Sequence, residues 1–222
     1  MKKYFPLFSL IPLLVFIARS QSEPQDTWAN WNKRLERAYE DINPIKVRGP
    51  MMGLLVPYTR RTDILPMSAF GYEILAQEKM NTIVFLIPLP ADSAVKGLLT
   101  TNMEFIESSF GNFPVDTVLL SELKTESDSF TIDNAFFYPK VPADLEIQLA
   151  NLKFILKGKV GTVKILPLFL KFDDLNSAVK DIAPLLAEKI KDDNMTSDVT
   201  FVMASDLTEN DFGNSLISSD NK

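Results

Sequence analysis

The sequence predicts a layered α/β/α domain with a largely parallel or mixed central sheet. Apolar runs of strand length alternate with segments whose apolar residues recur at helical spacing. The runs are apolar on both faces and end at turn residues, which is typical of buried central strands. Alternation of such strands with helices indicates parallel strands joined by helical crossovers.

The first predicted element is a helix over residues 28–42. Its apolar residues are spaced three, four and seven positions apart and therefore share one face. They are Trp28, Trp31, Leu35, Ala38, Tyr39 and Ile42. Asn43-Pro44 ends the helix, because a residue before proline disfavours the helical conformation. We expect Trp28 and Trp31 to pack in the core and not to form a platform for a ligand.

The remaining elements are predicted from the same two patterns. Compact apolar runs predict strands over 51–56, 82–87, 163–170 and 199–204. Helical spacing predicts helices over 68–76, 145–156 and 175–190. The more polar segment 117–130 is predicted to be an edge strand followed by a loop. In sheets of this kind, ligands bind at the carboxyl ends of the strands.

The amino-terminal segment has the features of a signal peptide. Lys2 and Lys3 precede an apolar run over residues 4–17, and Ala18-Arg19-Ser20 offers small residues where a signal peptidase cleaves. The run is shorter than the roughly 20 apolar residues of a membrane span. We therefore expect an exported protein, periplasmic or extracellular, without stable membrane insertion after cleavage. An uncleaved membrane anchor is the alternative.

The expected domain boundaries follow from these features. Residues 1–20 are the predicted signal peptide and 21–27 a short polar linker. Residues 28–212 form the predicted α/β domain, and 213–222 a polar tail. About 200 residues after the signal are enough to bury one hydrophobic core.

Composition excludes several classes of function. The chain has no histidine and no cysteine, so it lacks the commonest metal ligand, the usual general base and the thiolate nucleophile. Removal of residues 1–20, which contain three basic residues and no acidic one, leaves 20 basic and 29 acidic residues, a formal charge of −9. An acidic chain without a basic stripe is not expected to bind nucleic acid.

Short motifs stand in a fixed order at the predicted strand ends. Pro57-Tyr58-Thr59 follows the first strand, Pro88-Leu89-Pro90 the second, and Ala204-Ser205-Asp206-Leu207 the last. Asp144-Leu145-Glu146-Ile147-Gln148-Leu149 opens a helix. With Thr27-Trp28 before the first helix, this series resembles the motifs of the Memo family over about residues 26–212. The family is related in fold to class III extradiol dioxygenases, and the resemblance implies that fold here.

The resemblance also implies that the family's metal site has been lost. The positions of the family's histidines fall on Tyr58, Pro90, Ala143 and Glu209, and each is replaced. Proline and alanine have no donor atom for a metal, neutral tyrosine is a weak ligand, and Glu209 alone is one carboxylate. An iron, copper or zinc site needs several nitrogen or sulfur ligands, or a histidine–carboxylate face. We therefore predict no catalytic residue, no metal and no cofactor.

Other polar residues near these positions are candidates for a cleft. They are Arg60, Asp144, Glu146, Ser205 and Asp206. Carboxylates can bind Mg²⁺ or Ca²⁺, or act as a general acid–base pair. The alternative is structural: Asp206 caps the following segment, and Glu146 pairs with backbone or basic groups. Arg60, together with Arg61, either binds an anion or is solvated.

Two functions from different classes follow. The first is a pseudoenzyme, an exported Memo-like protein that acts by binding an unknown small ligand or a protein partner. The alternative is a hydrolase or other enzyme that uses a carboxylate-bound divalent cation around Asp144, Asp206 and Glu209. The resemblance further implies that the family's carboxyl-terminal portion has no counterpart here. We therefore expect a truncated carboxyl-terminal edge that a protein partner or a second copy of the chain covers.

Overall fold

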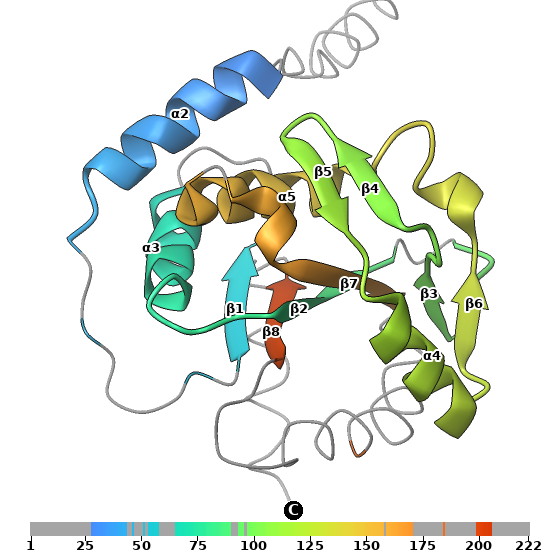
Figure 1. The fold of residues 1–222 in the computed structure, drawn as a ribbon. Coiled ribbons are helices and arrows are strands. Elements are labelled where there is room, and N and C mark those ends of the chain that lie inside the picture. Colours follow the sequence, from blue (N-terminus) through green and yellow to red (C-terminus); the bar gives the residue numbers. More distant parts are fainter. Residues whose placement is uncertain are drawn as a thin grey trace, which may run out of the picture.

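A six-stranded mixed sheet forms the centre of the molecule (Figure 1). The computed structural model describes residues 28–43, 46, 51, 53–57, 65–89, 93–95, 97–157, 159–170, 184 and 199–205. Across the sheet the strands are β1 (Gly53–Pro57), β8 (Val199–Ser205), β2 (Thr82–Pro88), β7 (Lys164–Leu170), β3 (Leu98–Thr100) and β6 (Phe130–Ile132). All neighbours are parallel except β3 and β7. The predicted α/β architecture is confirmed.

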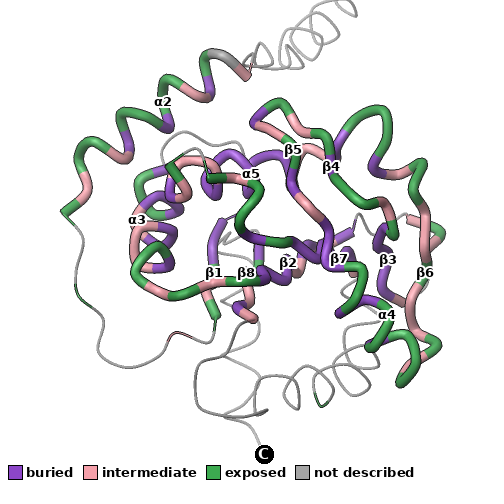
Figure 2. The backbone as a smooth tube through the Cα atoms, in the orientation of Figure 1, coloured by how far each residue is buried: buried purple, intermediate pink, exposed green. Residues whose placement is uncertain are grey.

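The central strands are apolar on both faces because each face has its own core. In β2, Ile83 and Phe85 belong to the larger buried cluster, whereas Val84 belongs to a second one. In β7, Ile165 and Leu166 divide in the same way. Successive side chains of a strand point to opposite faces, so a continuous apolar run is what two buried faces require. Figure 2 shows the buried residues concentrated in these strands and in the helix that crosses them.

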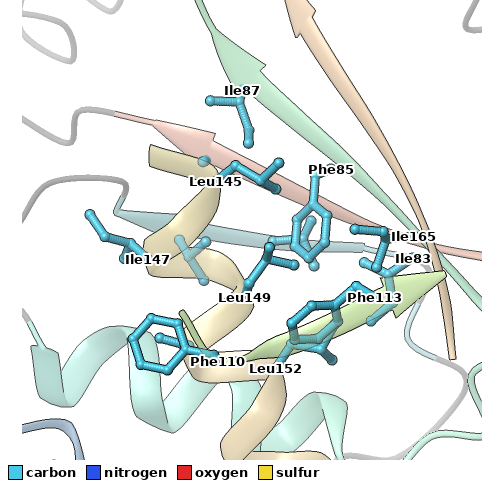
Figure 3. Packing of buried hydrophobic residues seen from close by; sticks show 14 of the residues in the cluster. Ile83, Phe85, Ile87, Phe110, Phe113, Leu145, Ile147, Leu149, Leu152 and Ile165 are labelled. Atoms are coloured by element: carbon cyan, nitrogen blue, oxygen red, sulfur yellow. The ribbon is translucent and has the colours of Figure 1, made fainter. Parts of the chain in front are cut away.

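Three helices cover the face of the larger cluster. They are α2 (Trp28–Glu40), α3 (Leu65–Leu75) and α5 (Ala143–Leu156). In α5, Leu145 and Leu149 point toward Phe85 of the sheet (Figure 3). The helix is buried on all sides from Leu145 to Leu152, because α2 and α3 lie against the surface that the sheet leaves uncovered (Figure 1).

Helix α2 packs on this layer through its apolar face, as predicted. Trp31 and Leu35 are buried, and Trp28 meets the ring of Phe110 edge to face at 5.6 Å between centroids. Tyr39 stacks on Phe154 of α5 at 4.8 Å. Both tryptophans therefore serve packing.

The opposite face carries α4 (Thr117–Glu126), and here the prediction for 117–130 is wrong. The segment is a helix followed by β6, and not an edge strand with a loop. Asp116 caps the helix by accepting the backbone N–H of Leu119 at 3.1 Å. Leu119, Leu120 and Leu123 bury against the sheet. The polar residues that suggested an edge strand are on the solvent side of a surface helix.

A hairpin over residues 105–114 was not predicted. It consists of β4 (Phe105–Ser108) and β5 (Gly111–Pro114), and its tip contacts α2 through Phe110. Two short 3₁₀ helices, η2 (Asn134–Phe136) and η3 (Val160–Thr162), complete the described elements.

Element ends differ from prediction by a few residues, with identifiable causes. Helix α3 begins at Leu65, three residues before the predicted start, because Pro66 lies in the first turn, where a missing N–H costs nothing. Gly71 lets this helix approach β1 closely: a Cβ there would lie 2.9 Å from a Leu54 methyl carbon. The predicted helix over 175–190 lies outside the described residues except for residue 184, as do the predicted signal peptide, linker and tail.

None of the helices within the described ranges is long and apolar enough to cross a membrane.

Backbone geometry at Gly97 generates a stability prediction. Gly97 has φ +73°, and a Cβ there would lie 2.3 Å from the carbonyl oxygen of Ser129 on the chain leading into β6. Gly97→Ala is expected to lower the free energy of unfolding by about 2 kcal/mol or more, because both the backbone conformation and the close contact oppose a side chain. Urea unfolding measures this value.

Gly161 provides the matched control. Nothing lies within 4 Å of a Cβ built on it, and its φ is not in the left-handed range. Gly161→Ala should leave the free energy of unfolding within about 0.5 kcal/mol of wild type, or raise it slightly. Equal effects of the two substitutions would contradict the packing of β3 against β6.

Candidate functional site

The predicted site is at the carboxyl edge of the parallel strands. Pro57 at the end of β1 is in register with Ser205 at the end of β8, and Pro88 of β2 is in register with Leu170 of β7. Four strand ends therefore meet at one edge. Tyr58, Arg60, Pro90, Asp206 and Glu209 lie outside the described residues, so their convergence stays a prediction.

Helix α5 brings the remaining predicted residues toward this edge. Its first residue is Ala143, and Gln148, five positions later, donates from Nε2 to the Pro57 carbonyl at a long 3.5 Å. The Ala143 side chain is a methyl group, so it offers no ligand atom at the start of the helix. The structure thus places Ala143, one of the four positions to which the resemblance assigns a family histidine, near the predicted edge.

Gln148 joins three elements and was not predicted as a site residue. Its Oε1 accepts the hydroxyl of Tyr72 in α3 at 2.9 Å, while its Nε2 reaches β1. Gln148 and Tyr72 are both fully buried. The buried Gln148 amide both donates and accepts a hydrogen bond within the protein. It therefore holds the surrounding elements in place and is not available as a reactive group.

Two tyrosines next to α5, the fully buried Tyr72 and the partly buried Tyr39, are held in their neutral form. Burial raises the pKa of Tyr72 well above its usual range. Burial also raises the pKa of Tyr39, with further contributions from Tyr72 and Glu73. The Tyr39 hydroxyl donates to Oδ1 of Asn151 at 3.1 Å. Neither phenol is ionised near neutral pH, so neither serves as an anionic nucleophile or phenolate ligand.

Glu146 supports the hairpin and does not belong to an acidic cluster. The side chain is 3 % exposed, and its Oε1 accepts the backbone N–H of Ser109 at 2.7 Å. Glu146 therefore pairs with a backbone group, as the structural alternative for this residue predicted. The contact joins α5 to the β4–β5 turn. Its Oε2 has no hydrogen-bond partner among the described residues.

Asp144 and Glu146 do not form a catalytic pair on the helix. Residues two positions apart on an α-helix point to different faces. Asp144 is partly exposed, whereas Glu146 is buried. Within the described ranges, no group of three or more acidic side chains is close enough to hold a metal ion.

A second buried carboxylate, Asp116, lies at the opposite, amino edge of the sheet. Its Oδ2 accepts the hydroxyl of Thr82 at 2.6 Å, and its Oδ1 accepts the N–H of Leu119. The Lys164 ammonium lies 3.7 Å from Oδ1. Both oxygens are occupied by groups that join β2, β7 and α4. Asp116 is therefore structural, and its position before a helix is the sequence signal of a cap.

The comparisons with known proteins agree with the fold. A family model described as Memo-like protein matches residues 24–216, a range that contains every element described above. A search of curated proteins finds no match.

The contact between Glu146 and Ser109 predicts that Glu146 acts as a structural hydrogen-bond acceptor and not as a metal ligand. Glu146→Gln keeps an oxygen for the Ser109 N–H and should change the free energy of unfolding by less than about 1 kcal/mol. Glu146→Ala leaves that N–H unpaired and should cost about 2–3 kcal/mol. Urea unfolding of the two variants tests this order.

Glu107, an exposed carboxylate on β4, supplies the control. Glu107→Ala should stay within about 0.5 kcal/mol of wild type. If Glu146→Gln were as destabilising as Glu146→Ala, the carboxylate charge and not the hydrogen bond would be what the fold requires.

Proposed function

This chain belongs to the Memo-like protein family, and we propose that it acts by binding, without the metal chemistry that histidine ligands support. The observation that carries the proposal is the absence of histidine and cysteine from all 222 residues. Iron, copper and zinc sites depend on imidazole or thiolate ligands. A chain with neither retains the scaffold and loses the means to hold such a metal.

The contacts that remain around the carboxyl edge support a retained framework. Gln148 ties α5 to β1 and α3, and Glu146 ties α5 to the β4–β5 hairpin. These polar side chains are buried and engaged with other elements, which preserves the shape of the layer behind the edge. A framework that keeps its shape but has no reactive side chains is better suited to binding a ligand or partner than to catalysing a reaction.

The ligand region that we propose is the carboxyl edge itself. Tyr58 and Asp206 are the next residues after Pro57 and Ser205, which are paired in register. Loops that leave neighbouring parallel strands at this edge form the usual ligand crevice of such sheets. Arg60 and Glu209 follow in sequence on the same two segments, so the proposed region includes residues of both charges for a small ligand or a protein partner.

Metal content and thermal stability test the proposal. Purified protein is expected to carry no stoichiometric iron, copper or zinc by elemental analysis. Its Tm should shift by less than about 1 °C with Mg²⁺, Ca²⁺, Mn²⁺ or EDTA, because only an ion that binds the folded state stabilises it. Stoichiometric transition metal would overturn the proposal.

Asp206→Asn and Asp128→Asn form a matched pair for the enzymatic alternative. Both remove one negative charge, and Asp128 is an exposed residue between α4 and β6. A stabilisation by Mg²⁺ or Mn²⁺ that disappears in Asp206→Asn and persists in Asp128→Asn would favour a carboxylate-bound cation over the binding role.

Restoration of the lost ligands tests which positions formed the site. The combined substitutions Tyr58→His, Pro90→His, Ala143→His and Glu209→His are expected to create a site that binds one Zn²⁺ per chain. Imidazole ligands from the loops and from the start of α5 would then converge at the carboxyl edge. Titration with Zn²⁺ measures this, with wild type as the control, and failure to bind Zn²⁺ would contradict the assignment of the four positions.

Export is the second part of the proposal, supported by the charge and apolar pattern of residues 1–20. Expressed with these residues in a bacterial host, the protein is expected in the periplasmic fraction with Gln21 as its first residue. Ser20→Phe places a large side chain at the cleavage position and should leave the precursor uncleaved. Mass spectrometry reads both outcomes, and retention of intact wild-type precursor in the cytoplasm would contradict export.

A further inference from the structure

A groove of about 740 Å³ lies at the amino edge of the sheet, away from the carboxyl edge. Its walls come from the carboxyl-terminal ends of α3 and α5 and from the segments that enter β2 and β7. The volume is within the range of small-molecule sites. The groove is broadly open to solvent.

The floor of the groove is apolar. Ile155 and Val163 are buried members of the larger core cluster. Met80 and Leu156 pack against that cluster while remaining partly accessible. An apolar surface continuous with the core and accessible from a groove favours a ligand with a hydrocarbon portion.

The rim carries charges of both signs, and they come from different elements. Lys157 and Lys159 follow α5, whereas Glu73 and Glu78 belong to the α3 side. Lys46 adds a third ammonium, so the five side chains sum to +1 in a chain whose net charge is −6. In the part of the chain that the structure describes, no salt bridge joins these lysines to Glu73 or Glu78.

The positive charge of the α5 side comes from two lysines that follow the end of the helix. The backbone N–H of Lys157 donates to the Phe154 carbonyl at 3.2 Å, and that of Lys159 donates to the Leu156 carbonyl at 2.9 Å. Two carbonyls near the end of α5, those of Phe154 and Leu156, are thus engaged by backbone groups. The Lys157 and Lys159 side chains are exposed, and their two full positive charges exceed the partial negative charge of the helix end for an anion beside them.

Lys157 has an unusual backbone for a residue with a side chain. Its φ is +49°, in the left-handed conformation that ends many helices and that glycine adopts most easily. Within the described residues it is the only non-glycine residue with a positive φ. The left-handed backbone is less favourable for lysine than for glycine. A residue that is kept in an unfavourable backbone conformation is expected where its side chain contributes to function.

We propose that this groove binds an amphipathic monoanion, with a hydrocarbon chain on the floor and a carboxylate beside Lys157 and Lys159. A free medium-chain fatty carboxylate has this chemistry. Glu73 and Glu78 at the α3 side disfavour a second negative charge, so monoanions are selected over dianions. The proposal is independent of the proposed function, because the groove and the carboxyl edge are at opposite ends of the strands.

Calorimetric titration of the full chain with dodecanoate, below the concentration at which it forms micelles, tests the proposal. Saturable binding with one site per chain is expected. Lys157→Glu combined with Lys159→Glu should weaken binding at least tenfold, because the anion then meets two like charges. The control reverses two exposed lysines elsewhere, Lys124→Glu with Lys140→Glu, which changes net charge equally and should leave binding within twofold.

Lys157→Gly separates binding from folding. Glycine relieves the left-handed backbone, so Tm should rise or stay unchanged, while dodecanoate binding should weaken severalfold. Dodecylammonium, with the same chain and the opposite charge, should bind wild type at least tenfold more weakly than dodecanoate. No saturable binding of dodecanoate, or equal losses in the two double-lysine variants, would overturn the proposal.

Discussion

Burial of both faces of the central strands is the constraint on which the rest of this structure depends. Strands β2 and β7 lie in the middle of the sheet and pair along their whole length. Alternate residues, such as Phe85 and Val84, enter two separate cores. Each core needs a helical cover, so the helices on both sides are consequences of the apolar strands. At about 25 cal/mol per Å² of apolar surface removed from water, this burial is the main favourable term in folding.

Helix α5 is costly to bury and is stabilised by specific polar contacts. It lies between the sheet and the outer helices, and it carries Glu146, Gln148 and Asn151 into the interior. A buried polar group without a partner is destabilising. Glu146 contacts the hairpin, Gln148 contacts Tyr72, and Asn151 accepts from Tyr39. These contacts fix the register of α5 against the β4–β5 hairpin, α3 and α2, which nonspecific apolar packing would not do.

The two edges of the sheet have different chemistry. At the carboxyl edge the described strands end at Pro57, Ser205, Pro88 and Leu170, next to the start of α5. Behind them, the Gln148 side chain is engaged with Tyr72 and Pro57. At the amino edge, Asp116 is saturated by Thr82, Lys164 and the α4 backbone. The groove at the same edge contains lysines without carboxylate partners among the described residues. The two binding regions that we propose are therefore separable, one at the carboxyl edge and one at the ends of α3 and α5.

The local sequence pattern was sufficient to predict strands that are buried on both faces, such as residues 82–87. A continuous run of β-branched and apolar residues is typical of a buried strand and not of an exposed element. The local pattern failed for 117–130, where three leucines become an inner helical face only when the sheet lies beneath them. It also left the roles of Glu146 open, since Ser109 is 37 residues away in the chain.

The sequence by itself determined that no imidazole or thiolate site can exist in this chain, because side-chain chemistry is set by composition alone. It also indicated the family and the α/β layers. Only the tertiary structure decided that Glu146 and Asp116 are used as hydrogen-bond acceptors. It also decided that lysines without carboxylate partners among the described residues lie on the rim of a groove with an apolar floor. The physical reason is that a side chain's hydrogen bonds, burial and charge partners depend on residues distant in the sequence. The packing of the layers determines which of these residues come into contact.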